Sequence, residues 1–328
     1  MSVWNVFDPD AFSLHSLTAA INQVPFTPML LSQLGIFDEQ GIPTTTALIE
    51  ENNGVLALVE VAPRNAPGQV VNADKRKVRN FSIPHLPSRA SIMADEVQGV
   101  REFGSEGNAR TIESARTARL IKMRRQLDYT LESHRLSVIK GTYIDVNGTA
   151  TNLYTAFNVT QDTVDFALNS TGTKVRSKCL TTLGHIEQGL GGINFTGVHA
   201  LCGATFFDNL ITHTNVEATY LNQVGASELR GDPRQILNFG GIVFERYRGT
   251  SAVQIDDKEA YAFPMGVPEL FLTRFAPANY LETVNTIGLP YYAKSKVMDF
   301  DKGLDLEAQS NPLNLCTRPA AVVKLTTP

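Results

Sequence analysis

The residues that could carry out chemistry are few and lie far apart in the chain. Six histidines and three cysteines occur, and none of them forms an H-E-x-x-H or C-x-x-C motif. The most suggestive spacing is His199 with Cys202, within the segment "GVHALCG", which reads as a buried strand. Two such side chains make half of a four-ligand zinc site. Because no second half is visible, we interpret both as core residues and predict no metal.

Motifs for phosphate binding and nucleophilic catalysis are also missing. The stretch "GLGGINFTG" matches neither G-x-G-x-x-G nor the P-loop, and the chain contains no G-x-S-x-G sequence. We therefore expect neither an enzyme nor a cofactor. The alternative hypothesis from this set of residues is a soluble α/β enzyme that uses His199, Cys202 and Asp208.

The composition is that of a chain able to build a core. Of its 328 residues, 43% are hydrophobic and 19% charged, and the length favours about two domains. The net charge of -4 lacks the basic excess of a general nucleic-acid binder. No apolar run approaches the roughly 18 residues that span a bilayer, and "MSVWNVFDPDAF" does not resemble a signal peptide. With three scattered cysteines, we expect a soluble cytoplasmic chain without membrane contact.

The segments that would position any functional residue begin with an arm. Asp10 can cap a short helix in which Leu14, Leu17 and Ile21 recur at helical spacing. A helix of about ten residues is marginal on its own in water. It must therefore pack on a surface, either of its own subunit or of another one.

A protruding hairpin is predicted next. The strand-like runs "TTALIEE" and "GVLALVEVA" lead into the charged segment "PRNAPGQVVNADKRKVR", and the chain is extended again around Pro84 and Pro87, which exclude a helix. The basic cluster at the end of this segment lacks interleaved aromatic residues for base stacking. We interpret it as a solvated loop tip or as a partner for the acidic residues of another subunit. Its members are Lys75, Arg76, Lys77 and Arg79.

The strongest helix signal covers residues 105–140 and ends at Gly141. Such a helix would be on the order of 50 Å long and would serve as a spine for other elements. One apolar stripe follows the helical period: Leu120, Met123, Leu127, Leu131 and Val138. The other side is basic, and either intersubunit ion pairs or an anionic surface would explain it: Arg110, Arg116, Arg119, Lys122, Arg124, Arg125 and Arg135.

The remaining chain predicts a mixed α/β region followed by further strands. "TYIDVNGTATNLY" has a hairpin turn at Asn147 and Gly148, and helix and strand patterns alternate from about residue 175. The tail, including "AVVKL", is expected to return as strands to the sheet under the spine. "FPMGVPELFLTRFAP" is apolar, broken by prolines and empty of chemistry. We therefore expect its burial to be shared between copies of the chain.

The order of these parts resembles the major capsid protein E family of tailed phages, of the lambda type. The most specific stretches are "FPMGVPELFLTRFAPANYLETVNTIGLPYYAK" and "LEAQSNPLNLCTRPAAVVKL". The resemblance implies an α+β fold, the Hong Kong 97-type phage capsid fold. It assigns residues 1–45 to an N-terminal arm and 46–90 to an extended hairpin, the E-loop. Residues 91–150, with the spine helix, and 276–328 would form the peripheral P domain, and residues 151–275 the α/β A domain.

The resemblance also implies a function and partners. The chain would self-assemble as hexamers and pentamers into an icosahedral head shell in the host cytoplasm and remain in the virion. Scaffold and portal proteins, a decoration protein at threefold sites and packaged double-stranded DNA without sequence-specific contact would be its partners. An encapsulin-like protein compartment is the alternative within this fold. Residues hypothesised to contact other subunits are Trp4, Phe7, Phe12, Leu17, Arg64, Lys75, Arg76, Lys77, Arg79, Arg116, Arg119 and Arg124.

Overall fold

The computed structural model describes residues 14–23, 29–52, 76–98, 111–217, 236–250 and 253–328. The expected tip of the E-loop lies outside these ranges. Arg76 and Lys77 lie on a described strand, but their side chains are not described. The hypothesised contact residues outside the described part are Trp4, Phe7, Phe12, Arg64 and Lys75.

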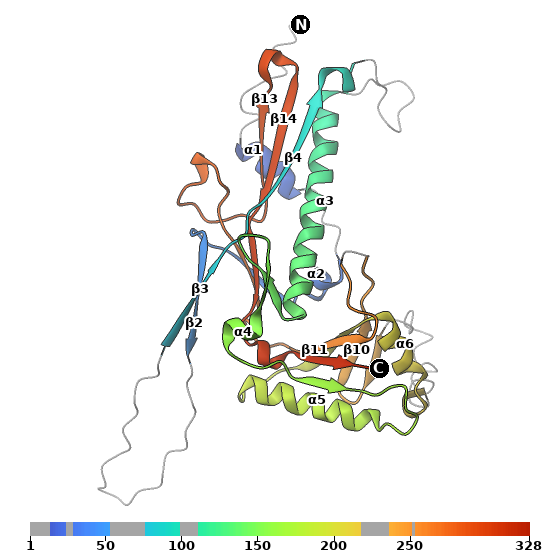
Figure 1. Ribbon diagram of the computed structural model, residues 1–328. Helices are drawn as coiled ribbons and strands as arrows, with labels where there is room; N and C mark the ends of the chain where they lie inside the picture. Colours follow the sequence, from blue (N-terminus) through green and yellow to red (C-terminus); the bar gives the residue numbers. More distant parts are fainter. Residues whose placement is uncertain (1–13, 24–28, 53–75, 99–110, 218–235, 251–252) are drawn as a thin grey trace, which may run out of the picture.

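The spine helix is α3, Ile112–Ile139, and it runs along the upper half of the molecule in Figure 1. It begins at Ile112 and not at residue 105, because Thr111 is extended and its side chain accepts the backbone N–H of Ser114 at 3.1 Å. Residues 105–110 lie outside the described part. With 28 residues, the helix is about 42 Å long. Gly141 follows its end with a φ of 91°, a conformation that glycine adopts without strain.

The upper part of the molecule packs a three-stranded antiparallel sheet against α3. Its strands are β13 (Tyr292–Val297), β14 (Gly303–Ser310) and β4 (Leu86–Met93), in that order. The spine residues Leu120, Met123 and Leu127 are buried against Ile92 and Leu306 of this sheet. Leu131 and Val138, further along the same stripe, are also buried.

The expected arm helix is α1, Leu14–Gln23, and it packs on its own subunit. It lies beside β13 and α3, where the side chains of Leu17 and Ile21 are buried in the upper core. The proposal that Leu17 contacts another subunit is therefore wrong. The apolar stripe of α1 packs on the spine and the sheet of the same chain. This packing removes the Leu17 side chain from water without a second copy.

A second three-stranded sheet joins the beginning, middle and end of the chain. β12 (Phe271–Phe275) pairs in parallel with β1 (Phe37–Gly41) and antiparallel with β15 (Pro312–Cys316). The short helix α2 (Leu30–Leu34) lies near the lower end of α3. Since β1 is part of this sheet, the segment assigned to the arm ends inside the core.

The proline-broken stretch "FPMGVPELFLTRFAP" is buried within the subunit, contrary to expectation. Phe263, Leu270, Phe271 and Phe275 are all buried, three of them in one core that also includes parts of α3 and β15. The prolines and Gly266, which has a φ of 75°, allow the chain to leave one sheet and enter the next. Its apolar content therefore serves the internal junction between two sheets.

A six-stranded mixed sheet forms the lower part of the molecule (Figure 1). Helices α5 (Val175–Leu190) and α6 (Ala204–Thr212) pack on one face of it, and the other face joins the core around β12. The strands, in spatial order, are β7 (Thr163–Asp165), β16 (Val323–Thr326), β11 (Glu259–Met265), β8 (Gly197–Cys202), β10 (Ile242–Arg246) and β9 (Ile236–Phe239).

The position of β16 corrects the interpretation of the tail. The 3-10 turn η5 (Pro319–Ala321) directs "AVVKL" away from the spine and into this lower sheet, between β7 and β11. β12, conversely, lies in the middle sheet although residues 151–275 were assigned to the A domain. The domain ranges assigned in the sequence analysis thus do not coincide with the sheets of the structure.

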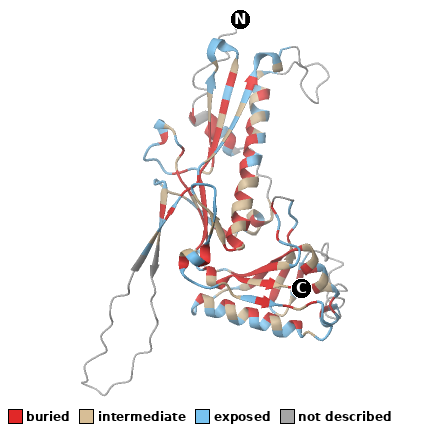
Figure 2. Ribbon diagram, viewed as in Figure 1, coloured by how far each residue is buried: buried red, intermediate tan, exposed pale blue. Residues whose placement is uncertain are grey.

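The smaller elements lie outside the three larger sheets. β2 (Thr46–Asn52) and β3 (Arg76–Ser82) form a two-stranded ribbon that projects from the body at the left of Figure 1. In Figure 2, the strands of the lower sheet are mostly buried, in contrast to the exposed residues at the base of the ribbon. β5 (Thr142–Ile144) and β6 (Ala150–Asn152) form the hairpin predicted around Gly148, followed by α4 (Leu153–Phe157). The remaining 3-10 turns are η2 (Ala94–Glu96), η3 (Leu281–Thr283) and η4 (Asp299–Asp301). Within the described residues, no helix combines the length and apolar character needed to cross a bilayer.

Candidate interaction surfaces

The three residues of the enzyme hypothesis do not form one site. His199 lies within 2.9 Å of Glu245 (Nε2 to Oε2) and beside the ring of Phe263, on the sheet face opposite to Cys202. Asp208 lies instead on α6, where it pairs with Arg246 at 3.4 Å. Across the ranges described above, no three His, Cys, Asp or Glu residues are grouped so that they could hold a metal ion.

The cysteines are equally poor candidates for nucleophiles. All three are buried and none forms a disulfide. Burial raises the pKa of Cys179 and of Cys316 to about 12, and it also raises the pKa of Cys202. The reactive form of a cysteine is its thiolate. These thiols therefore stay protonated near neutral pH and contribute to packing.

Arg124, expected at an intersubunit contact, is buried inside its own subunit. Its Nε donates to Asp128 Oδ1 at 2.8 Å, and its Nη1 donates to the carbonyl of Ile21 in α1 at 2.9 Å. The guanidinium also stacks 3.6 Å from the ring centre of Tyr291, whose hydroxyl donates to Asp128. The prediction for Arg124 is wrong because α1 and Tyr291 of the same subunit cover its side chain.

Two further buried charges continue this row along α3. Arg135 pairs with Glu39 of β1 at 2.5 Å, and Glu132 accepts the backbone N–H of Leu31 at 2.9 Å and the hydroxyl of Tyr247. Burial raises the pKa of the Glu132 carboxyl above its ordinary value of 4.5. Part of the basic side of the helix is thus an internal network that holds α2, β1 and the lower part to the spine.

The other arginines of the spine lie nearer to the surface. Arg119 pairs with Glu96 at 2.7 Å and Arg116 with Glu113 at 3.4 Å, both partly exposed. Lys122 and Arg125 are exposed. The intersubunit role of Arg116 and Arg119 stays a prediction.

Arg79 ties the projecting ribbon to the body. It lies on β3, donates to the carbonyls of Ala156 and Phe157 in α4, and its guanidinium lies 5.0 Å from the ring centre of Phe157. Phe81 packs against Phe157 and Tyr143 at the same place. The base of the ribbon is therefore fixed, while Leu48 on its other strand is 66% exposed.

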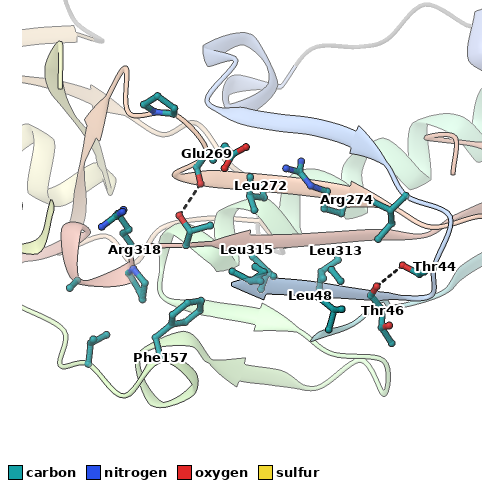
Figure 3. Close-up of a pocket in the computed structure, with 18 of the residues that line it drawn as sticks. Thr44, Thr46, Leu48, Phe157, Glu269, Leu272, Arg274, Leu313, Leu315 and Arg318 are labelled. Atoms are coloured by element: carbon teal, nitrogen blue, oxygen red, sulfur yellow. Dashed lines mark hydrogen bonds between the residues drawn. The ribbon is translucent and has the colours of Figure 1, made fainter. Parts of the chain in front are cut away.

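A groove of about 660 Å³ lies between β2 and the middle sheet (Figure 3). Leu272, Leu313 and Leu315 line it from the sheet, with Leu48 contributed by the ribbon, as Figure 3 shows. Arg274 is held in its wall by Asp38 at 2.9 Å. This mostly apolar lining suits the side chains of a protein partner and offers no grouping for catalysis.

Close to this groove, the loop of residues 278–290 presents apolar side chains to solvent. Leu281 is 94% exposed and Ile287 is 69% exposed. The loop is held from inside: the buried Thr283 hydroxyl donates to the carbonyl of Ala278 at 2.6 Å, and the N–H of Gly288 donates to the carbonyl of Ile42 at 3.1 Å. A fixed loop that exposes large apolar groups is a feature of an interface.

Sequence reasoning missed both this loop and the groove. The available signal was "ANYLETVNTIGLP", where aliphatic residues follow neither a helical nor an alternating period. Residues with such spacing do not share one face of a helix or strand, so some of them must stay exposed. The spacing does not indicate which side chains point outward.

The fold and these surfaces define a class of protein: an elongated subunit with a spine helix, a projecting ribbon and apolar protrusions. The fold itself is found in capsid proteins of known structure. The capsid protein of a prophage of E. coli CFT073, described as putative, matches with a TM-score of 0.60 at 12% identity, covering 96% of this chain and 99% of that one. The capsid of cyanophage P-SCSP1u matches with a TM-score of 0.56 at 12% identity, covering 92% and 88%. The expected Hong Kong 97-type α+β fold is confirmed.

The sequence matches the family model described as "Phage major capsid protein E" over residues 13–327, and the chain belongs to that family. The major capsid protein of Salmonella phage Felix O1 is 28% identical, with 95% of each chain covered. That of Pseudomonas phage KPP10 is 29% identical, covering 95% of this chain and 96% of that one. The chain is a structural subunit of a phage head shell.

Proposed function

We propose that copies of this chain join into hexamers and pentamers through the protrusions described above. The observation that carries the proposal is the contrast between a closed internal core and large aliphatic side chains left exposed at fixed positions. Leu48 of the ribbon and Leu281 and Ile287 of the loop are the clearest cases. Single exposed apolar residues are common on any protein, but several on ordered projections indicate a partner.

The magnitudes favour many contacts for each subunit. The loop of residues 278–290 exposes four aliphatic side chains: Leu281, Val284, Ile287 and Leu289. Burying them would contribute roughly 6–12 kcal/mol, at about 1.5–3 kcal/mol each. Association itself costs about 4–15 kcal/mol. For one such contact, the gain from burial is about equal to the cost of association. Stable assembly therefore requires several contacts around each copy, which then act cooperatively.

The proposal includes the partners that the family resemblance implies. Scaffold and portal proteins would act during assembly in the host cytoplasm, and a decoration protein would bind at threefold sites. The net charge of -4 supports a wall that does not bind the packaged DNA tightly. The chain would have no enzymatic role, which the separation of His199, Cys202 and Asp208 supports.

The rival within this fold is an encapsulin-like compartment that encloses protein. Electron microscopy of the purified chain, alone and with a candidate scaffold, tests assembly, and analysis of the contents of particles from infected cells tests the cargo. The proposal expects closed particles that contain double-stranded DNA. Particles that enclose a defined protein and no genome would favour the rival.

A further inference from the structure

The far end of the P domain carries an exposed aromatic ring beside an apolar groove. Phe300 lies in η4, at the turn between β13 and β14, and is 90% exposed. The groove, about 240 Å³ in volume, lies between the end of β4, the start of α3 and this same turn. Ile92 and Leu304 are buried at its base, and Met93, Val97, Ile112 and Val297 also line it.

The backbone holds Phe300 outward at a conformational cost. Phe300 and Asp301 have φ values of 61° and 53°, a left-handed conformation that is unusual for a bulky side chain. Three hydrogen bonds fix the turn: Met298 N–H to Gly303 O, Asp301 N–H to Met298 O, and Ala94 N–H to Lys302 O. Strained residues of this kind persist where the surrounding structure maintains them, often at functional positions.

The groove is large enough for the ring. An apolar cavity of about 150 Å³ is enough to hold benzene, so a groove of about 240 Å³ can accept one phenyl ring. Apart from Gln98 and Asp301, the residues that line the groove are apolar or glycine, which suits an aromatic ring. The exposed charges around it are Lys296, Asp299, Asp301, Lys302 and Asp305, with Asp95 on the adjacent η2.

We infer that Phe300 of one copy inserts into the groove of a neighbouring copy. Asp301, which follows Phe300, also lines the groove. The inserting ring and the receiving groove therefore lie at the same end of the elongated subunit (Figure 1). Copies arranged around an axis at this end can each place Phe300 in the next groove, and the set closes. This inference rests on the proposed function, because it requires copies that assemble.

Cross-linking between different copies tests the contact. Phe300→Cys chains and Met93→Cys chains are co-assembled with an excess of wild-type chain, purified as particles and mildly oxidised. Each variant carries one accessible thiol, because the native cysteines are buried. We expect at least a tenfold higher yield of dimers joining the two variants than in a matched mixture of Phe300→Cys with Leu180→Cys, where Leu180 is exposed on α5.

Intact particles with equal dimer yields in both mixtures would overturn this inference alone. Dimers joined through two copies of Phe300→Cys would show that position 300 of one copy lies against position 300 of another and not in the groove. That result would also overturn the inference. Absence of particles from the wild-type chain would overturn the proposed function and this inference with it.

Stability of the particles gives a second readout. Phe300→Ala should lower the urea concentration at which particles dissociate, and Phe300→Leu should recover part of the loss. The soluble subunits should melt alike, since the ring is exposed there. Phe300→Ala particles as resistant as wild-type particles would contradict the docking.

Discussion

At the scale of single residues, the buried charges of the spine decide how the subunit is held together. Arg124 and Asp128 pair through Asp128 Oδ1 and fix α1 and Tyr291 to α3. A buried pair of this kind adds little compared with apolar packing, but the loss of one partner leaves an uncompensated charge. The pair therefore makes the position of α1 specific.

Replacing Arg124 with alanine should destabilise the subunit by about 3–5 kcal/mol, because Asp128 would remain buried without its cation. Denaturant unfolding measures the change. Arg125→Ala is the matched control, since Arg125 is exposed and its loss should cost less than about 0.5 kcal/mol. Equal stability of the two variants would show that the Arg124 network has no structural role.

Glu132 should give the subunit a distinct pH dependence. Its pKa is raised in the folded state, so the folded chain binds this proton more tightly than the unfolded chain does. The contribution to stability is present below the ordinary pKa of 4.5 and is lost as pH rises through the raised value. Unfolding free energies of wild type and Glu132→Gln, measured across this interval, should diverge in favour of the variant as pH rises. A constant difference would contradict the assignment.

At the scale of elements, the spine shows what spacing can and cannot predict. The 3.6-residue period marks α3 and its apolar stripe, and Asn147 with Gly148 marks the β5–β6 turn, because both signals are local. Arg124 and Arg135 were placed on an exposed side because the helical period does not reveal that α1, α2 and β1 cover that side. The destination of β16 depends on η5 and on pairing with distant strands, which no local pattern encodes.

Leu127→Asp tests the role of the spine. The substitution places an unpaired charge against the upper sheet, a cost of at least about 4 kcal/mol, and should abolish cooperative folding. Circular dichroism during heating is the measurement. Gln126→Asp, at the exposed neighbouring position, should melt nearly as the wild type does. A cooperatively melting Leu127→Asp subunit would mean that the stripe does not support the core.

At the scale of the whole molecule, the fold class follows from the order of its parts, whereas the interaction surfaces do not. The sequence showed much apolar material around residues 263–277, and the structure uses it inside the subunit. Among the described residues, the surfaces that we propose for partners are the Leu48 ribbon, the 278–290 loop and the Phe300 turn. Apolar content alone did not distinguish burial inside the subunit from contact with a partner. That distinction requires knowledge of which strands cover one another.

Leu281→Asp separates folding from assembly. Leu281 makes little contact within its own subunit, so the soluble variant should keep its stability within about 0.5 kcal/mol. Assembly should fail, because a charge would enter an apolar contact, and sedimentation velocity would show subunits in place of particles. Leu180→Asp should assemble normally, since Leu180 is exposed on α5 away from these surfaces. Normal particles from Leu281→Asp would remove the loop from the interface.

Hydroxyl-radical footprinting of the soluble subunit and of the purified shell examines the whole account at once. If identical copies cover one another's apolar protrusions, labelling of Leu48, Leu281, Ile287 and Phe300 should drop several-fold in the shell while Leu180 stays equally reactive. Unchanged labelling of those four side chains in intact shells would contradict the account.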